Sequence, residues 1–165
     1  MHAYPKQNNR VNGQMKKLFR EAQIEDLPKL VALLMDDELG QAYENSIDLT
    51  PYEQAFKAIL VDPNHLVLII ASDHKILGCV QISYLPNLTF KGTWRAQLEG
   101  VRIDKKNRGR GLGKQLINEA IALAKARGCG IIQLTTNKTR LKTVAFYESL
   151  GFQNTHDGMK LYLYS

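Results

Sequence analysis

Apolar positions along the chain recur at two spacings, which together predict an ordered mixture of strands and helices. Continuous apolar runs of strand length occur at residues 65–72 and 131–136 and predict buried strands. The turn Asp73-His74 separates the first run from residues 75–85, so these two segments predict a hairpin. Weak alternation over residues 16–22 and an apolar stretch at 94–103 predict two further strands.

Helical spacing of apolar residues predicts four helices. They are expected to begin near Asp26, Thr50, Leu112 and Thr139, and glycines at 128 and 151 are expected to stop the last two. Thr50-Pro51 suits an N-cap followed by proline at the first helical position. The helix that follows is expected to bury Phe56, Ile59 and Leu60.

The order of elements predicts an α/β fold. Phe152 and residues 159–164 are expected to form closing strands, which gives the order β-α-α-β-β-β-α-β-α-β-β without an internal repeat. This order is typical of a mixed sheet with helices on its faces. The chain of 165 residues is expected to form a single domain over 15–165, preceded by a polar, flexible tail at 1–14.

Composition excludes several classes of protein and leaves an ordinary globular domain. Charged residues make up 23% and hydrophobic residues 44%, and no apolar run approaches the length of a membrane span. The two cysteines, Cys79 and Cys129, predict buried packing residues in a reducing compartment, so the cytoplasm is the expected location. The four histidines show no ligand spacing, so no metal is expected.

The net charge of +6 conceals an uneven distribution along the chain. Residues 24–62 hold nine acidic and two basic residues, whereas residues 102–142 hold eleven basic and two acidic ones. The asymmetry favours separate surfaces for a cationic and an anionic ligand, although solvated helix faces would also account for single charges.

A glycine-rich loop between a strand and a helix is the strongest chemical signal. Residues 108–113 read Arg-Gly-Arg-Gly-Leu-Gly and open a helix whose N–H groups and dipole suit an anion. A Walker loop would need glycine at 108 and Ser or Thr at 115, where Arg108 and Gln115 stand. A dinucleotide fingerprint would need a third glycine at 114, where Lys114 stands. A diphosphate cradle and a solvated glycine-rich turn both stay open from these residues alone.

The rest of the chain favours the cradle. Arg-x-x-Gly-x-Gly, followed at a distance by the block Ala-Phe-Tyr-Glu-Ser-Leu-Gly-Phe at 145–152, resembles the GNAT family of N-acetyltransferases. The resemblance covers residues 16–164 and is most specific in the blocks 97–116 and 134–152. It implies a small, bacterial-type member with a mixed, mostly antiparallel sheet, splayed central strands and about four flanking helices.

The same resemblance implies acetyl-CoA as the donor substrate, without a metal. The backbone of Val101 and Ile103 would bond the pantetheine amides, although both side chains also suit plain core packing. Asn137 would contact the cofactor or simply cap a turn, and Phe146 would lie against the cofactor arm. The N–H groups expected to bind the pyrophosphate belong to Arg108, Gly109, Arg110, Gly111, Leu112, Gly113 and Lys114.

Two residues are expected to carry the chemistry of acyl transfer, which needs a neutral amine and benefits from a proton on the leaving thiolate. Glu99 lies on an otherwise apolar strand, near the bulge that the resemblance implies for this strand. As a partly buried carboxylate, it would act as the base directly or through water. Its alternative role is an outward-facing partner of Arg95 or Arg102. Tyr147 matches the family tyrosine that would protonate the thiolate, and its alternative is a structural hydrogen bond. Since neither cysteine has a partner that would activate it, direct transfer in a ternary complex is favoured over an acyl-enzyme.

The resemblance implies an acceptor site among the first two helices, their linker and the loop after the third and fourth strands, and here that linker is acidic. Asp37, Tyr43 and Tyr84, among other acidic and tyrosine residues nearby, predict a cationic small-molecule amine. A protein lysine or N-terminus fits equally well. Two other classes stay open: a CoA-binding sensor without turnover, and a basic nucleic-acid-binding module over 102–142, for which no recognised motif is present. No nucleic acid and no membrane are expected as partners, and a homodimer is possible.

Overall fold

A computed structural model describes residues 17–36, 48–73 and 75–163 of the chain. One sheet carries strands β1 (Lys17–Glu21), β2 (His65–Ser72), β3 (Lys75–Leu85), β4 (Arg95–Ile103) and β5 (Ile131–Leu134) in the order β1-β2-β3-β4-β5. The helices are α1 (Leu27–Leu34), α3 (Thr50–Val61), α4 (Thr89–Gly92), α5 (Leu112–Ala126) and α6 (Leu141–Glu148). Three of the strand pairs are antiparallel and β4 pairs with β5 in parallel, so the expected mixed, mostly antiparallel sheet is confirmed.

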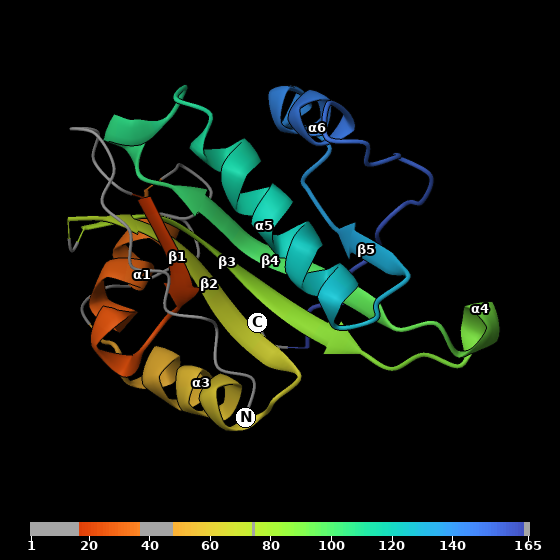
Figure 1. Cartoon of the computed structure of the whole chain (residues 1–165), viewed down its shortest axis with the longest axis horizontal. Coiled ribbons are helices and arrows are strands. Elements are labelled where there is room, and N and C mark those ends of the chain that lie inside the picture. The colour runs from red at the N-terminus through yellow and green to blue at the C-terminus, as the bar shows by residue number, and fades with distance from the viewer. Residues whose placement is uncertain (1–16, 37–47, 74, 164–165) are drawn as a thin grey trace.

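Helices cover both faces of this sheet, which explains the continuous apolar runs (Figure 1). Leu68 and Ile70 of β2 pack with α5 on one face, whereas Ile69 and Ala71 of the same strand pack with α1 and α3 on the other. Since neighbouring strand residues point to opposite faces, a strand buried on both faces needs apolar residues at every position. The sheet therefore has two hydrophobic cores.

Helix α5 ends on a glycine, as its sequence predicts. Gly128 has a φ of +84°, and its N–H donates to the Lys125 carbonyl at 3.0 Å. The next N–H, from Cys129, donates to the Ala124 carbonyl at 2.9 Å. These two bonds form a Schellman motif, which satisfies the last carbonyls of the helix.

The closing strands expected after residue 151 are wrong for the described part of the chain, because residues 152–163 contain no strand. The stretch 153–158 is polar and exposed, so it offers a sheet no apolar face to bury. The run after it is exposed as well, with Met159 at 96%, Leu161 at 85% and Tyr162 at 73%, although Lys160 and Tyr162 border a cavity described below. The expected tail at 1–14 lies outside the described residues.

Three smaller expectations about the helices need correction. Thr50 is the first residue of α3 and Leu49 is its N-cap, so the expected cap is one residue off. Phe56 is buried as expected, but Leu60 is 48% exposed since it lies off the stripe that faces the sheet. The turn α4 was not expected; Phe90 in it has a φ of +51°, which makes the turn left-handed. Of the helices described, none is both long and apolar enough to cross a membrane.

Candidate active site

The sheet opens between β4 and β5. Their parallel pairing runs from Arg95 opposite Ile131 to Leu98 opposite Leu134 and stops there, because β5 ends while β4 continues to Ile103. Within the described chain, no strand pairs with residues 99–103 on the β5 side. Exposed backbone N–H and C=O groups along such an edge can bond an extended ligand. The splayed central strands are thus present, with an edge at Val101 and Ile103 that no described strand pairs.

A bulge in β4 lies at the point where the strands separate. Cys79 pairs with Arg102 and Gln81 pairs with Glu99, so β4 advances three residues where β3 advances two. Gly100, inside the bulge, has a φ of +60°, which favours glycine. The extra residue reverses the alternation of the strand, because Leu98 before it and Val101 after it both pack on the α5 side.

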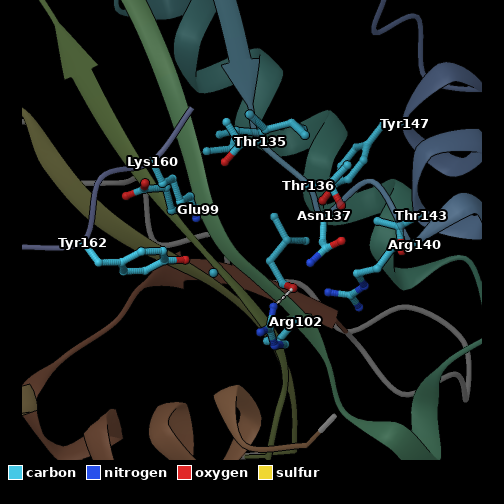
Figure 2. Close-up of a pocket in the computed structure, with 14 residues that line it drawn as sticks. Glu99, Arg102, Thr135, Thr136, Asn137, Arg140, Thr143, Tyr147, Lys160 and Tyr162 are labelled. Atoms are coloured by element: carbon cyan, nitrogen blue, oxygen red, sulfur yellow. Dashed lines mark hydrogen bonds between the residues drawn. The ribbon is translucent and has the colours of Figure 1, made fainter. Parts of the chain in front are cut away.

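A cavity of about 440 Å³ occupies the opening between the two strands (Figure 2). Its walls come from the end of β4, the loop after β5, the start of α6 and the C-terminal segment. The lining residues are Leu98, Glu99, Gly100, Val101, Arg102, Leu134, Thr135, Thr136, Asn137, Arg140, Thr143, Tyr147, Lys160 and Tyr162. Both residues expected to carry the chemistry are in this set.

Glu99 lines the cavity from β4, immediately before the bulge. Its side chain is exposed, so the expectation of a partly buried carboxylate is wrong. Arg95, one of the two arginines considered as its partner, donates to Thr89 Oγ1 at 2.9 Å and lies 5.8 Å above the Phe90 ring. An exposed carboxylate beside the free edge is accessible to an incoming amine.

Tyr147 lines the cavity from α6 and is only 8% exposed. Its ring meets Phe146 and Phe152 edge to face, with centroids at 5.2 and 5.6 Å. Burial raises the pKa of Tyr147 above its usual value, and the positive charges of Arg140 and Arg102 offset part of that rise. The phenol therefore keeps its proton at neutral pH and can serve as a donor.

The glycine loop lies beyond the end of β4, outside the residues that line the cavity. Gly109 and Gly111 have φ values of +74° and +72°, and Gly111 is the N-cap of α5. The Gln115 N–H donates to the Gly111 carbonyl at 3.1 Å, so the preceding N–H groups, including those of Gly113 and Lys114, have no partner within the helix. Arg110 and Lys114 are exposed around them. This arrangement fits a diphosphate, as the sequence predicts.

Phe146 and Gly113 hold the loop against α6. A Cβ at Gly113 would come within 3.3 Å of Phe146 Cζ, so the absence of a side chain there allows the phenyl ring to lie on the helix start. Leu112 anchors the same turn, since it is only 3% exposed. Phe146 thus lies between the loop and Tyr147, on the path from one to the other.

Arg108 plays a different part from the rest of the loop. Its Nε donates to the Ile103 carbonyl at 3.0 Å, and its Nη2 donates to the Asp36 carbonyl at 2.9 Å. The Asp36 carboxylate also accepts the Lys105 N–H at 2.8 Å. The Arg108 side chain therefore ties the loop to the end of α1 rather than reaching toward a phosphate.

Asn137 and Val101 combine local and cavity contacts. Asn137 Oδ1 accepts the N–H and hydroxyl of Thr139 at 3.0 and 2.8 Å, so the expected turn is present, and it also lines the cavity. These bonds use Oδ1 alone, which leaves the amide nitrogen for a ligand. Arg102 Nη1 donates to the Val101 carbonyl at 3.0 Å, the bond dashed in Figure 2.

The residues expected at the acceptor do not assemble in the described structure. Tyr84 is only 5% exposed, and Arg127 lies 5.5 Å above its ring, outside the cavity lining. Burial raises the pKa of Tyr84 to about 12. Asp37 and Tyr43 lie outside the described residues.

Sequence reasoning missed several residues of the cavity: Arg102, Thr135, Thr136, Arg140, Thr143, Lys160 and Tyr162. The two threonines follow β5 directly, so their position after a buried strand was an available signal. Lys160 and Tyr162 alternate with apolar residues, a pattern that predicted a strand instead.

Comparison with known proteins identifies the family. The model of the Acetyltransferase (GNAT) family matches residues 28–152. A crystal structure described as a transcriptional regulator from Bacillus halodurans is 41% identical, with a TM-score of 0.87, over 90% of this chain and all of that one. The aminoalkylphosphonate N-acetyltransferase of Salmonella typhimurium is 24% identical over 83% of this chain and 85% of its own length. Glucosamine 6-phosphate N-acetyltransferase of Trypanosoma brucei brucei is 33% identical over 53% of this chain.

The chain belongs to the GNAT acetyltransferase family. The matches to two of the curated relatives are partial, since they span 57% of the trypanosomal enzyme and 43% of human N-acetyltransferase 8B. A structure of a Clostridium acetobutylicum acetyltransferase with acetyl-CoA shares the fold at a TM-score of 0.71, over 90% of this chain and 97% of that one, with 22% identity.

Proposed function

We propose that this protein is an acetyl-CoA-dependent N-acetyltransferase that moves the acetyl group to a primary amine by direct transfer. The observation that carries the proposal is that Glu99 and Tyr147 line one cavity from different walls, at the point where β4 and β5 separate (Figure 2). The glycine loop lies beyond the end of β4 and contacts Phe146, the neighbour of Tyr147. Family membership supports the donor, because acetyl-CoA is the ligand that the related acetyltransferase structure contains.

The donor would lie across the opening in an order set by its chemistry. Its pyrophosphate would meet the N–H groups of residues 109–114 and the cations of Arg110 and Lys114. The pantetheine amides would bond the free backbone edge at Val101 and Ile103, with the Asn137 amide opposite. The thioester would then reach the bulge at Gly100, between the two proposed catalytic side chains.

Transfer needs one proton removed and one supplied. Glu99 takes a proton from the acceptor amine, directly or through water, and the amine nitrogen attacks the thioester carbonyl. As the tetrahedral intermediate collapses, the C–S bond breaks and the Tyr147 hydroxyl protonates the departing sulfur. The acceptor enters as an ammonium ion, and the second proton that its nitrogen loses returns to the Tyr147 phenolate, while Glu99 releases its proton to water. The products are an acetamide, the free thiol of CoA and one proton.

The cysteines favour direct transfer over an acyl-enzyme. Cys79 is buried, its thiol donates to the Gly100 carbonyl at 3.7 Å, and burial raises its pKa to about 12. Burial also raises the pKa of Cys129, which lies outside the cavity lining. Since the thiolate is the nucleophilic form, neither side chain is suited to accept the acetyl group.

The acceptor class is proposed as a small amine. The names of two relatives, which act on glucosamine 6-phosphate and on aminoalkylphosphonates, support a small molecule over a protein lysine or N-terminus. The expectation that the acceptor is cationic depends on Asp37, Tyr43 and other acidic residues, several of them outside the described part of the chain. A cytoplasmic location and a homodimer stay predictions.

The test is thiol release from acetyl-CoA in the presence of a panel of small amines. We expect turnover that falls about 100-fold or more in Glu99→Gln and in Tyr147→Phe. Glu148→Gln and Tyr84→Phe are matched controls outside the cavity and should keep the wild-type rate. Unchanged rates in both cavity variants would remove these residues from the mechanism. Absence of thiol release with every amine would instead favour a sensor without turnover.

A nucleic-acid interface is the second candidate, favoured by the basic region 102–142 and by the name of the Bacillus halodurans relative. Titration of a labelled DNA duplex separates the two, because phosphate binding is strongly salt-dependent. DNA binding that persists at saturating acetyl-CoA would show a function beyond acetyl transfer. Turnover without affinity for DNA would leave acetyl transfer alone.

A further inference from the structure

The C-terminal segment brings a cation and a hydroxyl to the same cavity as the proposed base. Lys160 and Tyr162 line it together with Glu99, and Figure 2 draws all three on one side. The segment passes beside the loop after β5, because a Cβ at Gly158 would lie 3.8 Å from Thr135 Cγ2. An ion pair between Asp157 and Lys138, at 2.6 Å, also ties the segment to that loop.

The charge of the cavity lining is unlike that of a site for a cationic acceptor. The basic lining residues are Arg102, Arg140 and Lys160, and the acidic one is Glu99. The pantetheine arm of the donor is uncharged, and the donor's phosphates have their own cations at Arg110 and Lys114. The charge of Lys160, on the Glu99 side of the cavity, is therefore not accounted for by the donor.

Lys160 is the cation best placed to meet the acceptor. It lies on the Glu99 side, whereas Figure 2 shows Arg140 across the cavity near Asn137 and Thr143. Among the described residues, no acidic side chain comes within ion-pair distance of its ammonium group. An ammonium group without a carboxylate partner at the wall of a cavity attracts an anionic ligand group.

We infer that the acceptor carries an oxyanion, such as a phosphate, phosphonate or carboxylate, on the same small molecule as its primary amine. The inference rests on the proposed acetyl transfer. Glu99 receives the amine, and Lys160, with the Tyr162 hydroxyl, binds the oxyanion. This arrangement orients the amine toward the thioester and discriminates against neutral and purely cationic amines.

The experiment compares acceptor pairs that differ only in the anionic group, at saturating acetyl-CoA. Suitable pairs are 2-aminoethylphosphonate with ethanolamine, and glucosamine 6-phosphate with glucosamine. We expect kcat/KM to be about 10-fold or more higher for the anionic member, the range of one hydrogen bond to a charged group. Lys160→Met should abolish this preference by raising the KM for the anionic acceptor, while the KM for acetyl-CoA stays unchanged.

Two variants control the result. Lys160→Arg keeps the charge and should keep much of the preference. Lys125→Met removes an exposed lysine at the far end of α5 and should change nothing. Equal or better turnover of the neutral acceptors by the wild-type protein would overturn the inference. So would an equal loss for both members of a pair in Lys160→Met, since Lys160 would then act on Glu99 rather than on the acceptor.

Failure of the proposed function has a different signature. If no amine causes thiol release, acetyl transfer is wrong, and calorimetric titration of the same pairs onto the CoA-saturated protein decides the inference separately. Tighter, Lys160-dependent binding of the anionic member would uphold an oxyanion site. Equal binding of both members would overturn it.

Discussion

Removal of the Asp36 carboxylate should weaken acetyl-CoA binding, although this residue lies at the end of α1 and outside the cavity lining. Its Oδ2 accepts the Lys105 N–H at 2.8 Å and the Arg108 Nη2 at 3.2 Å, so it fixes the chain on both sides of the turn that enters the glycine loop. The Asp36 side chain is 27% and that of Arg108 43% exposed, so solvent screens these bonds. We assign about 1 kcal/mol to each bond.

Asp36→Ala removes both bonds, about 2 kcal/mol, which corresponds to a rise of about 30-fold in the KM for acetyl-CoA if the loop orders only on binding. Asp36→Asn keeps an oxygen for the Lys105 N–H and should raise the KM for acetyl-CoA by about 5-fold. Steady-state kinetics with a fixed amine measures this, and kcat should change little. Glu53→Ala, which breaks an exposed ion pair with Lys57 on α3, is the control. A lower melting temperature with an unchanged KM would show that Asp36 only stabilises the fold.

Three further outcomes are expected. Because Gly100 has a φ of +60°, Gly100→Ala should lower the unfolding free energy by about 1 kcal/mol and should also lower kcat. Gly128 has a φ of +84° but lies away from the site, so Gly128→Ala should lower the unfolding free energy alone. The alkaline limb of the rate profile should lie above the usual tyrosine pKa near 10 and vanish in Tyr147→Phe, and a limb at or below that value would contradict the assignment. Burial alone would raise the pKa of Asp26, but hydrogen bonds from Arg20 and from a backbone N–H lower that pKa on balance. The ionised carboxylate therefore stabilises the fold at pH values above its unfolded pKa near 3.8. When the unfolding free energy is measured as a function of pH, this contribution should disappear as the pH falls below about 4. In Asp26→Asn the loss should be absent.

The sequence was sufficient for the elements whose burial is uniform. The hairpin of β2 and β3 has the bounds predicted for it, because a strand covered on both faces is apolar at every position and needs no knowledge of register. The start of α5 was equally clear, since glycines at 109 and 111 adopt the left-handed conformations that the anion loop requires. Both signals are local.

Positions that depend on distant segments could not be predicted in the same way. Whether Tyr84 faces a cavity or the core depends on its partner Arg127, which comes from the far end of α5. The terminal run at 159–163 has the alternation of a strand, and only its placement beside the end of β5 shows that Lys160 enters a cavity. The exposure of Glu99 likewise depends on where β5 stops, which the apolar run at 131–136 overestimates by two residues.

The bulge in β4 joins the two halves of the proposed chemistry. Before the bulge, the even-numbered residues Ala96 and Leu98 pack on the α5 side of the sheet. After the bulge, the odd-numbered residues Val101 and Ile103 pack on that same side. Without the extra residue, regular alternation would turn either Glu99 or the pair Val101 and Ile103 to the other face. With the bulge, the carboxylate reaches the cavity while the strand beyond keeps its core face and presents its free edge to the donor. A change in the register of β4 would therefore disturb donor and acceptor together, which makes this strand, more than any single side chain, the element that defines the site.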